Sequence, residues 1–387
     1  MPNGVETHGK GLRVYFRLDG DLVREPLKMA PTPDNIAHAE NMVAMIQHEI
    51  QQGTFDYARW FPNSKRLQEN TLGHWLDTWL DIKARQVADS TLRGYRGVIE
   101  RYIRPRWGAD QADRIDTVGL EQWISTDLNR LHSKTIKETV AVMRGVYKLY
   151  RSRNQAAHDP TEGVVVRLPD KDPPDPFTRE EIDQILATPT KRTQELNLVQ
   201  FMIWSGPRVS EAIALAWEDV LDIKQGLIRF RRSKVRGKYR ITKTRRSDRV
   251  VELLKPAHQA LLAQRAITED MDPELMEITQ RDNRTIKREH LRPVFRSTNT
   301  GRSHYDDFRL RARFFEAHLK KAGVRYRGPG QCRHTFASQM LTAEMPVAWI
   351  IAQTGHTSER VFRDSYADWI REDASNMRDQ AAAKLGF

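Results

Sequence analysis

Residues 331–341 read QCRHTFASQML, and this stretch decides how the last part of the chain folds. Phe336, Met340 and Leu341 recur at the spacing of one helix face, which predicts a helix packed against a core. Arg333 stands in the first turn of this helix, where its side chain is free to bind an anion. We expect the neighbouring His334 to pack or to cap the helix rather than to take part in chemistry.

A glycine-histidine pair and a tyrosine follow this helix. A second helix is predicted from Pro346 to Gln353, and Gly355 and His356 come directly after it. Tyr366 lies ten residues beyond His356. Taken alone, the histidine is explained as a helix-end cap and the tyrosine as a core residue. The histidine and the tyrosine indicate a chemical role only when they are considered together with the residues upstream.

An arginine upstream lies at the start of another predicted helix. It is Arg208, within the segment SGPRVSE, and Glu211 follows one turn later. Free N–H groups and the dipole at a helix start favour a phosphate. A guanidinium adds a planar fork that can hold two phosphate oxygens. Taken alone, an ordinary surface arginine is the simpler interpretation of Arg208.

The segment from Arg229 to Arg249 is strongly basic. It holds eleven Lys or Arg residues and one Asp, with Ile, Tyr and Val between them, which favours a β-hairpin over a disordered tail. Such a ribbon can lie along a DNA groove, and Arg236 and Lys238 are candidate DNA contacts. Lys243 is placed to protonate a leaving 5′ oxygen. A purely electrostatic ribbon is the alternative.

Together these side chains form a set suited to phosphodiester transfer without a metal. Arg208 and Arg333 would neutralise the phosphate and stabilise the pentacoordinate transition state. Tyr366 would attack as the nucleophile, Lys243 would protonate the leaving oxygen, and His356 would hydrogen-bond the phosphate or assist proton transfer. The products would be a 3′-phosphotyrosine and a 5′ hydroxyl, so we expect no cofactor and no ATP.

The composition of the whole chain agrees with a nucleic-acid partner. The chain has 387 residues, which suggests about two to three domains, and a formal net charge of +12. Such a charge favours a polyanion, nucleic acid before an anionic membrane. No run of about 18 apolar residues exists, so we expect no membrane span. The single cysteine, Cys332, excludes an internal disulfide and fits a reducing compartment.

A first DNA-binding part is expected at the N-terminus. Residues 11–28 alternate as a β-hairpin and residues 33–52 as a helix, which gives a ββα-like unit within residues 1–65. Arg13 and Arg17 lie on one face of the hairpin and are candidate DNA contacts. A solvated strand face is the alternative explanation.

A helical domain is predicted next, over residues 66–160. Its four helices include one in which arginines alternate with tyrosines, and a Thr135 capping box is predicted for the last. Arg93 and Arg96 of the basic helix are candidate contacts to a DNA backbone, although a solvated helix face explains them as well.

A proline-rich linker over residues 161–176 precedes a catalytic domain over residues 177–387 that ends in a C-terminal tail. Thr178 and Glu181 form the capping box of its first helix. Residues 264–305 are interpreted as a polar insertion with little chemistry. Three short antiparallel strands are expected at Leu227–Phe230, Tyr239–Thr242 and Arg249–Leu253. The predicted fold class is therefore multidomain and mainly α, with small β elements.

At these positions the chain resembles the tyrosine recombinase family, the phage-type integrases. SGPRVSEAIALAWEDV resembles the first family box, ITKTRRSDRVVEL the lysine hairpin, QCRHTFASQML the second box, and TGHTSERVFRDSYADW the end of the site. The family usually has a histidine three residues before the second arginine, where this sequence has Gly330. The resemblance implies catalytic roles for Arg208, Lys243, Arg333, His356 and the nucleophile Tyr366, with Glu211 in support.

The resemblance also implies a function and partners. It implies an arm-type DNA-binding domain in residues 1–65, a helical core-binding domain and an α+β catalytic domain, which act as a homotetramer on double-stranded DNA attachment sites. The enzyme would integrate and excise a phage or other mobile element in the bacterial cytoplasm, on the nucleoid. A DNA-bending host factor and a directionality factor would be further partners. The alternatives are a type IB-like topoisomerase and a non-catalytic DNA-binding regulator, which Gly330 favours.

Overall fold

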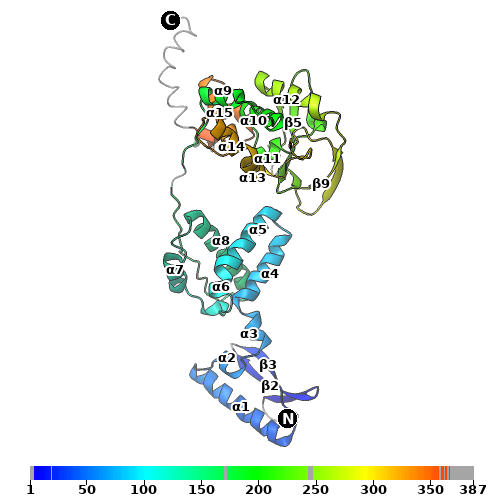
Figure 1. Ribbon diagram of the computed structural model, residues 1–387. Coiled ribbons are helices and arrows are strands. Elements are labelled where there is room, and N and C mark those ends of the chain that lie inside the picture. Colours follow the sequence, from blue (N-terminus) through cyan, green and yellow to red (C-terminus); the bar gives the residue numbers. More distant parts are fainter. Residues whose placement is uncertain are drawn as a thin grey trace. The chain divides into compact units, whose positions relative to one another are not determined.

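The chain divides into two compact units, Met1–Pro169 and Asp170–Phe387. The computed structural model describes residues 4–18, 20–169, 172–242, 247–356, 359–360, 362–363 and 366. Helices dominate both units, and each unit also contains a small sheet (Figure 1). The predicted multidomain, mainly α fold class is confirmed. The predicted boundaries of the DNA-binding domains and of the linker stay predictions.

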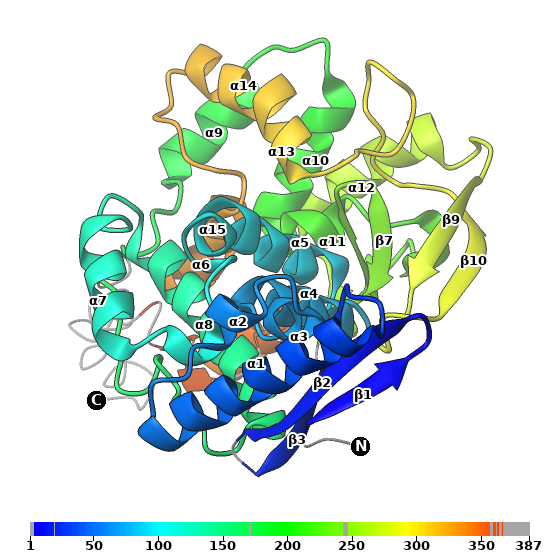
Figure 2. The same cartoon turned by 90° about the horizontal axis from the view of Figure 1, so that it is seen from below.

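The N-terminal part of the first unit is a three-stranded antiparallel sheet with one long helix along it (Figure 2). Its elements are β1 (Val5–His8), β2 (Gly11–Leu18), β3 (Asp21–Leu27) and α1 (Pro33–Gln52). Sequence alternation predicts β2, β3 and α1 but misses β1, because only Val5 of that short strand reaches the core. The shared core contains Leu12, Val14, Phe16, Ala39, Val43 and Ile46.

The rest of the first unit is helical. After the short α2 (Tyr57–Trp60) and α3 (Lys65–Glu69), it contains α4 (Leu72–Ala84), α5 (Asp89–Val98), α6 (Arg104–Trp107), α7 (Thr117–Thr126) and α8 (Ser133–Arg153). A π-helical turn, Ile99–Ile103, joins α5 to α6. The predicted Thr135 capping box is wrong, because α8 begins after His132 without a side-chain cap and Thr135 lies inside the first turn.

The second unit is built around α10 (Thr193–Ser205), against which α12 (Lys255–Thr268) and α15 (Gln331–Thr342) pack. Around them lie α9 (Arg179–Ala187), α11 (Val209–Ala212), α13 (Asp307–Leu310), α14 (Glu316–Lys321) and α16 (Val347–Thr354). The Thr178 and Glu181 capping box is confirmed at the start of α9. Phe336 of α15 is buried in the core, as the helical spacing predicts.

The strands of the second unit form two sheets rather than the single set of three that was expected. One sheet has the order β4 (Val220–Asp222), β5 (Leu227–Phe230), β8 (Arg249–Glu252), and the other has the order β10 (Ile286–Leu291), β9 (Glu274–Thr279), β7 (Lys238–Ile241), β6 (Arg232–Val235). Residues 264–305, interpreted as a polar insertion with little chemistry, contain two strands that were not predicted from the sequence. They contribute β9 and β10, and β9 pairs in parallel with β7.

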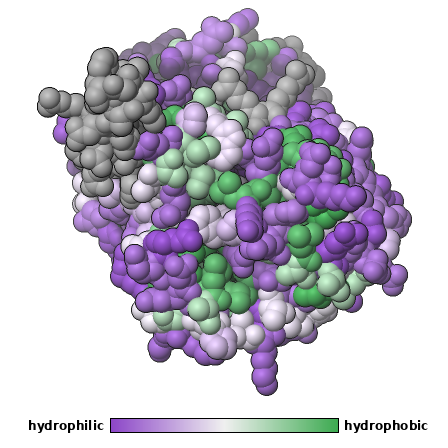
Figure 3. Space-filling model, turned by 90° about the horizontal axis from the view of Figure 1, so that it is seen from above, coloured by the Kyte–Doolittle hydropathy of each residue, from purple (hydrophilic) through white to green (hydrophobic). Residues whose placement is uncertain are grey.

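The surface of the chain is polar and carries its net positive charge. Figure 3 shows one face on which hydrophilic side chains predominate and smaller apolar groups lie between them. Within the described ranges, no helix combines the length and the apolarity that crossing a bilayer requires. Such a face suits a charged partner better than an apolar one.

Gly206 allows α10 and α15 to approach closely, which gives a testable prediction. Its φ is +66°, and a Cβ there would lie 2.5 Å from the ring of Phe336. Gly206→Ala should therefore combine about 1–2 kcal/mol for the left-handed backbone with about 1–3 kcal/mol of overpacking. Gly301 has a similar φ of +64° and nothing within 4 Å, so Gly301→Ala should lower the thermal unfolding temperature less. Equal shifts in thermal melts of the two full-length variants would contradict this packing argument.

Candidate active site

The ends of three helices converge on Arg333, in the first turn of α15. Its Nη1 donates to the carbonyl of Gly206, after α10, at 3.0 Å, and to the carbonyl of Thr354, the last residue of α16. Arg333 is 8% exposed, and its Nη2 has no hydrogen-bond partner in the described part of the chain. Burial, and next the charge of Arg208, lowers the pKa of Arg333 to about 9, so the side chain keeps its charge at neutral pH.

Glu211 is a buried anion beside Arg208. Its Oε1 accepts a hydrogen bond from Arg208 Nη1 at 2.7 Å, and its Oε2 accepts one from the backbone N–H of Arg208 at 3.0 Å. The Glu211 side chain is 3% exposed, whereas that of Arg208 is 44% exposed. Burial by itself raises the pKa of Glu211, but the charges of Arg249, Arg208 and Arg333 outweigh it and hold the pKa below its ordinary value. Glu211 therefore stays charged and fixes the direction of Arg208.

Arg249, at the start of β8, is a further buried arginine that the sequence reasoning missed. Its Nη2 donates to Glu211 Oε2 at 3.1 Å, and its Nε donates to the carbonyl of Gln353 at 2.7 Å. A third bond, from Nη1, reaches the carbonyl of Ser247. Arg249 thus connects the basic hairpin, the first-box carboxylate and the end of α16. Its partners lie 38 and 104 residues away, so no local spacing could identify it.

Tyr366 lies in the core of the second unit next to His334. Its hydroxyl is 2.7 Å from Nδ1 of His334, and its ring centroid is 4.7 Å from that of Phe362. Burial raises the pKa of the Tyr366 hydroxyl, and the charge of Arg333 opposes this. Burial, followed by the charge of Arg333, lowers the pKa of His334 and favours its neutral form. A neutral imidazole can accept a hydrogen bond from the phenol.

This contact gives His334 a place beside the candidate nucleophile. His334 was expected to pack or to cap its helix; it does not cap, because the N-cap residue of α15 is Gly330, but its ring packs 5.7 Å from that of Tyr366. The sequence carries no local signal for the pair, since Tyr366 lies 32 residues downstream. The histidine was therefore missed as a functional residue, although it directly follows Arg333.

His356 follows α16 and lies near the same group. Its Nδ1 is 2.7 Å from the hydroxyl of Thr354, and its ring centroid is 6.5 Å from that of Tyr366. Burial, then the charges of Arg333 and Arg208, lowers the pKa of His356 to about 3. At neutral pH His356 is therefore a neutral hydrogen-bonding group rather than a cation.

The sequence singles out two further positions, Lys243 and Gly330. Lys243 lies outside the described residues. Gly330 has ordinary helical backbone with a φ of −60°, and a Cβ added there would meet nothing within 4 Å. The space that a side chain would occupy is thus open. Within the described ranges, no group of three or more His, Cys, Asp or Glu side chains could hold a metal ion.

The candidate DNA contacts lie on three separate elements. Arg13 and Arg17 are on β2, Arg93 and Arg96 are on α5, and Arg236 and Lys238 flank the turn between β6 and β7. Arg13 pairs with Glu6, Arg17 bonds the carbonyl of Gly20, and Arg93 pairs with Asp89. Arg96, Arg236 and Lys238 are exposed. Arg13, Arg17, Arg93 and Arg96 belong to the first unit, and Arg236 and Lys238 belong to the second.

The sequence matches the phage integrase family over residues 176–369 and an arm DNA-binding domain over residues 2–65. It is 29% identical to the prophage integrase IntR of Escherichia coli strain K12 over 412 aligned residues, which span 100% of this chain and 98% of IntR. These matches define the class of the protein as a tyrosine-type site-specific DNA recombinase. The chain belongs to the phage integrase family.

Solved structures share this fold at low sequence identity. The Tn1549 transposon integrase in complex with a circular intermediate DNA aligns with a TM-score of 0.64 and 16% identity, over 79% of this chain and 99% of that one. A lambda integrase tetramer bound to a Holliday junction aligns with a TM-score of 0.59 and 14% identity, over 93% of this chain and 97% of that one. Both alignments extend well beyond the second unit.

The buried charge of Glu211 gives a prediction for stability. Glu211→Gln keeps the shape of the side chain but leaves Arg249 and Arg333 without their compensating anion. We expect a loss of about 3 kcal/mol, the lower end for breaking a buried ion pair, measured as a fall in the thermal unfolding temperature of the full chain. Glu252→Gln is the control, because Glu252 is exposed on β8. A variant of Glu211 as stable as the control would argue against this charge balance.

Proposed function

We propose that the chain integrates and excises a mobile genetic element, by cleaving and rejoining duplex DNA at attachment sites through a 3′-phosphotyrosine. The observation that supports this most directly is the grouping of Arg208, His334, His356 and Tyr366 within electrostatic reach of the buried Arg333. The group has a surplus of positive charge and a nucleophile, which is what attack on a phosphodiester requires.

In the proposed first step, the Tyr366 oxygen attacks the scissile phosphorus and the bond to the 5′ oxygen breaks. Arg208 and the unpartnered Nη2 of Arg333 hold the phosphate oxygens and stabilise the charge of the transition state. The proton of the phenol passes to His334, whose Nδ1 is 2.7 Å away. The leaving 5′ oxygen takes a proton from Lys243.

In the second step, a 5′ hydroxyl from the partner strand attacks the phosphotyrosine and releases Tyr366. The number of phosphodiester bonds is unchanged, so the reaction needs no external source of energy. His356 contributes as a neutral hydrogen-bond donor to the phosphate, because burial, and next the charges of Arg333 and Arg208, lower its pKa. A bound phosphate would offset that positive field and raise the pKa of His356.

Access to Tyr366 must change before the chemistry begins. The side chain is 0% exposed and belongs to the core of the second unit, in contact with Phe362. A phosphorus atom on DNA cannot reach a hydroxyl in that position. We therefore include in the proposal that the Tyr366 hydroxyl becomes accessible to the phosphate when DNA binds.

The rest of the proposed function concerns DNA binding and assembly. Residues 1–65 would bind arm-type sites, residues 66–160 would hold the core site, and residues 161–176 would link them to the catalytic residues 177–387. Arg13, Arg17, Arg93, Arg96, Arg236 and Lys238 would contact the DNA. The tetrameric lambda integrase on a Holliday junction supports a tetramer as the active assembly. We place the reaction in the bacterial cytoplasm, with a DNA-bending host factor and a directionality factor as partners.

Covalent capture tests the central step. Cells that express the chain are lysed in detergent without crosslinker, and the DNA that stays attached to the purified protein is sequenced. We expect attachment at one or two discrete loci, and its complete loss in Tyr366→Phe. Attachment that persists in the variant would exclude Tyr366 as the nucleophile. No attachment above the variant background would favour a regulator, and relaxation of supercoiled DNA without joining of two duplexes would favour a topoisomerase.

His334 has its own prediction, because it alone among the histidines lies at hydrogen-bond distance from the Tyr366 hydroxyl in the described ranges. His334→Gln should slow covalent complex formation by about 10²-fold, the lower range for one general base, without weakening DNA binding. The matched control is His318→Gln, since His318 is also buried but bonds the carbonyl of Ile185. Equal rates for the two variants in single-turnover cleavage assays would remove His334 from the mechanism.

A further inference from the structure

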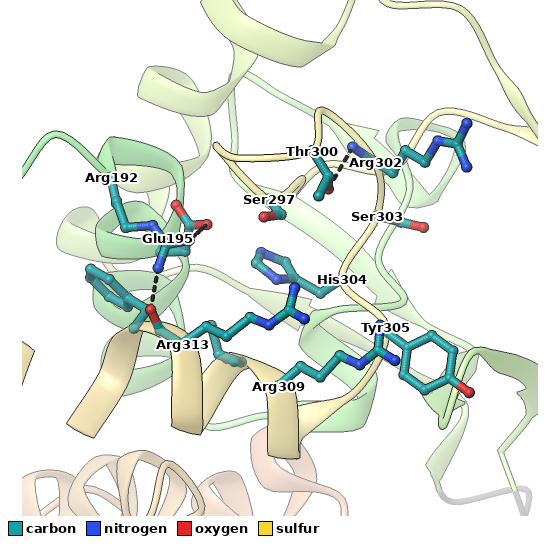
Figure 4. A pocket seen from close by; sticks show the side chains of 12 residues that line it. Arg192, Glu195, Ser297, Thr300, Arg302, Ser303, His304, Tyr305, Arg309 and Arg313 are labelled. Carbon is teal, nitrogen blue, oxygen red and sulfur yellow. Dashed lines mark hydrogen bonds and ion pairs between the residues drawn. The ribbon is translucent and has the colours of Figure 1, made fainter. Parts of the chain in front are cut away.

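A second basic site lies at the other end of α10. It is a cavity of about 270 Å³ lined by the first turn of α10, the loop after β10, and the segment from α13 into the π-helical turn Arg311–Phe315. Its charged side chains and its histidine are Arg192, Glu195, Arg302, His304, Arg309 and Arg313. Figure 4 shows the Arg313 guanidinium beside His304 and Arg192 beside Glu195, whereas Arg302 extends away from His304 and Arg309 lies against the ring of Tyr305.

The charges in this cavity do not balance. Glu195 is its one lining carboxylate, and both of its oxygens accept hydrogen bonds from Thr298, at 3.0 Å from the backbone N–H and at 2.5 Å from the hydroxyl. Arg192 adds a long ion pair with Glu195 at 3.9 Å. Arg302, Arg309 and Arg313 have no carboxylate within ion-pair distance in the described part of the chain, and Arg309 instead lies over the ring of Tyr305. The cavity thus has a surplus of positive charge.

His304 is the buried group that points into this cavity. It is 7% exposed, and its Nε2 has no hydrogen-bond partner among the described residues. In Figure 4 its ring lies between Ser297 and Arg313. A buried polar atom without a partner is uncommon, and each one calls for an explanation such as a missing ligand. An oxygen of a bound anion would provide that partner when Nε2 carries a proton.

The cavity is separate from the site around Arg333. Arg208 follows the C-terminal end of α10, and Arg192 and Glu195 lie at its N-terminal end. The helix has 13 residues, so these ends are about 18 Å apart at 1.5 Å per residue. A phosphate in one site therefore cannot occupy the other.

From this geometry we propose that the cavity binds a phosphate group, held by Arg313 and His304, with Arg302 and Arg309 adding positive charge to the lining. Guanidinium groups and an imidazole nitrogen are the donors that phosphate oxygens prefer in proteins. The phosphate belongs either to the backbone of a bound duplex or to a free phosphorylated ligand. The proposal goes beyond strand cleavage, since no reacting group lies in the cavity.

The test uses pyrophosphate and the full-length chain. Arg208→Gln serves as the background, because it removes the competing anion site of the proposed active site. Calorimetric titration at fixed ionic strength should show saturable pyrophosphate binding. Adding Arg313→Gln should weaken that binding about tenfold or more, the effect of one lost charged hydrogen bond. Adding Arg311→Gln is the control, because Arg311 lies two residues away, over the ring of Phe308, and does not line the cavity.

A second arm identifies the source of the phosphate. The logarithm of the affinity for a duplex is measured against the logarithm of the salt concentration. If the ligand is the DNA backbone, Arg313→Gln should reduce the slope by about one. An unchanged slope together with lost pyrophosphate binding would indicate a free phosphorylated ligand. Absence of saturable pyrophosphate binding with an unchanged slope, or equal effects of Arg311→Gln and Arg313→Gln, would overturn the proposal. Neither arm involves cleavage, so failure here is distinguishable from failure of the Tyr366 experiment.

Discussion

The candidate site depends on one buried carboxylate among three arginines. Glu211 bonds Arg208 and Arg249 directly and lies within the electrostatic reach of Arg333. One negative charge cannot neutralise three positive ones, so the group keeps a net positive field in a region of low dielectric. Burial lowers the pKa of Arg333 and of His356, and the charges of the neighbouring arginines lower both further. This surplus of positive charge supports the proposal that a phosphate binds there.

Hydrogen bonds to backbone carbonyls also hold these arginines in place. Arg333 donates to the carbonyls of Gly206 and Thr354, and Arg249 donates to that of Gln353. These carbonyls stand at the C-terminal ends of α10 and α16, where the helix dipole is negative and favours a cation. The helix ends therefore stabilise positive charge without neutralising it through further carboxylates. The guanidinium groups are therefore held in fixed positions and keep the positive charge that attracts DNA.

The sequence could predict the parts of this site that rest on local patterns. The pair of Arg208 and Glu211, one turn apart, and the position of Arg333 at the start of a predicted helix can both be recognised from neighbouring residues. Arg249 and His334 were missed because their partners are 38 and 32 residues away, and only tertiary packing unites them. The strands β9 and β10 in residues 264–305 were not predicted, although they pair as a local hairpin, because the mixed apolar and charged residues of Glu274–Thr279 do not alternate cleanly in the sequence.

The burial of the proposed nucleophile follows from the same balance of forces. In the core Tyr366 loses hydration, which holds its proton more tightly, while the field of Arg333 acts in the opposite direction. In the chain without DNA, the effect of burial exceeds that of Arg333, and the pKa of Tyr366 stays raised. A reactive phenolate therefore does not form there. A DNA phosphate would bind the exposed Arg208 first, because Arg333 is nearly inaccessible. Activation of Tyr366 would then require both its release from the core and the entry of the phosphate, which couples cleavage to the presence of DNA.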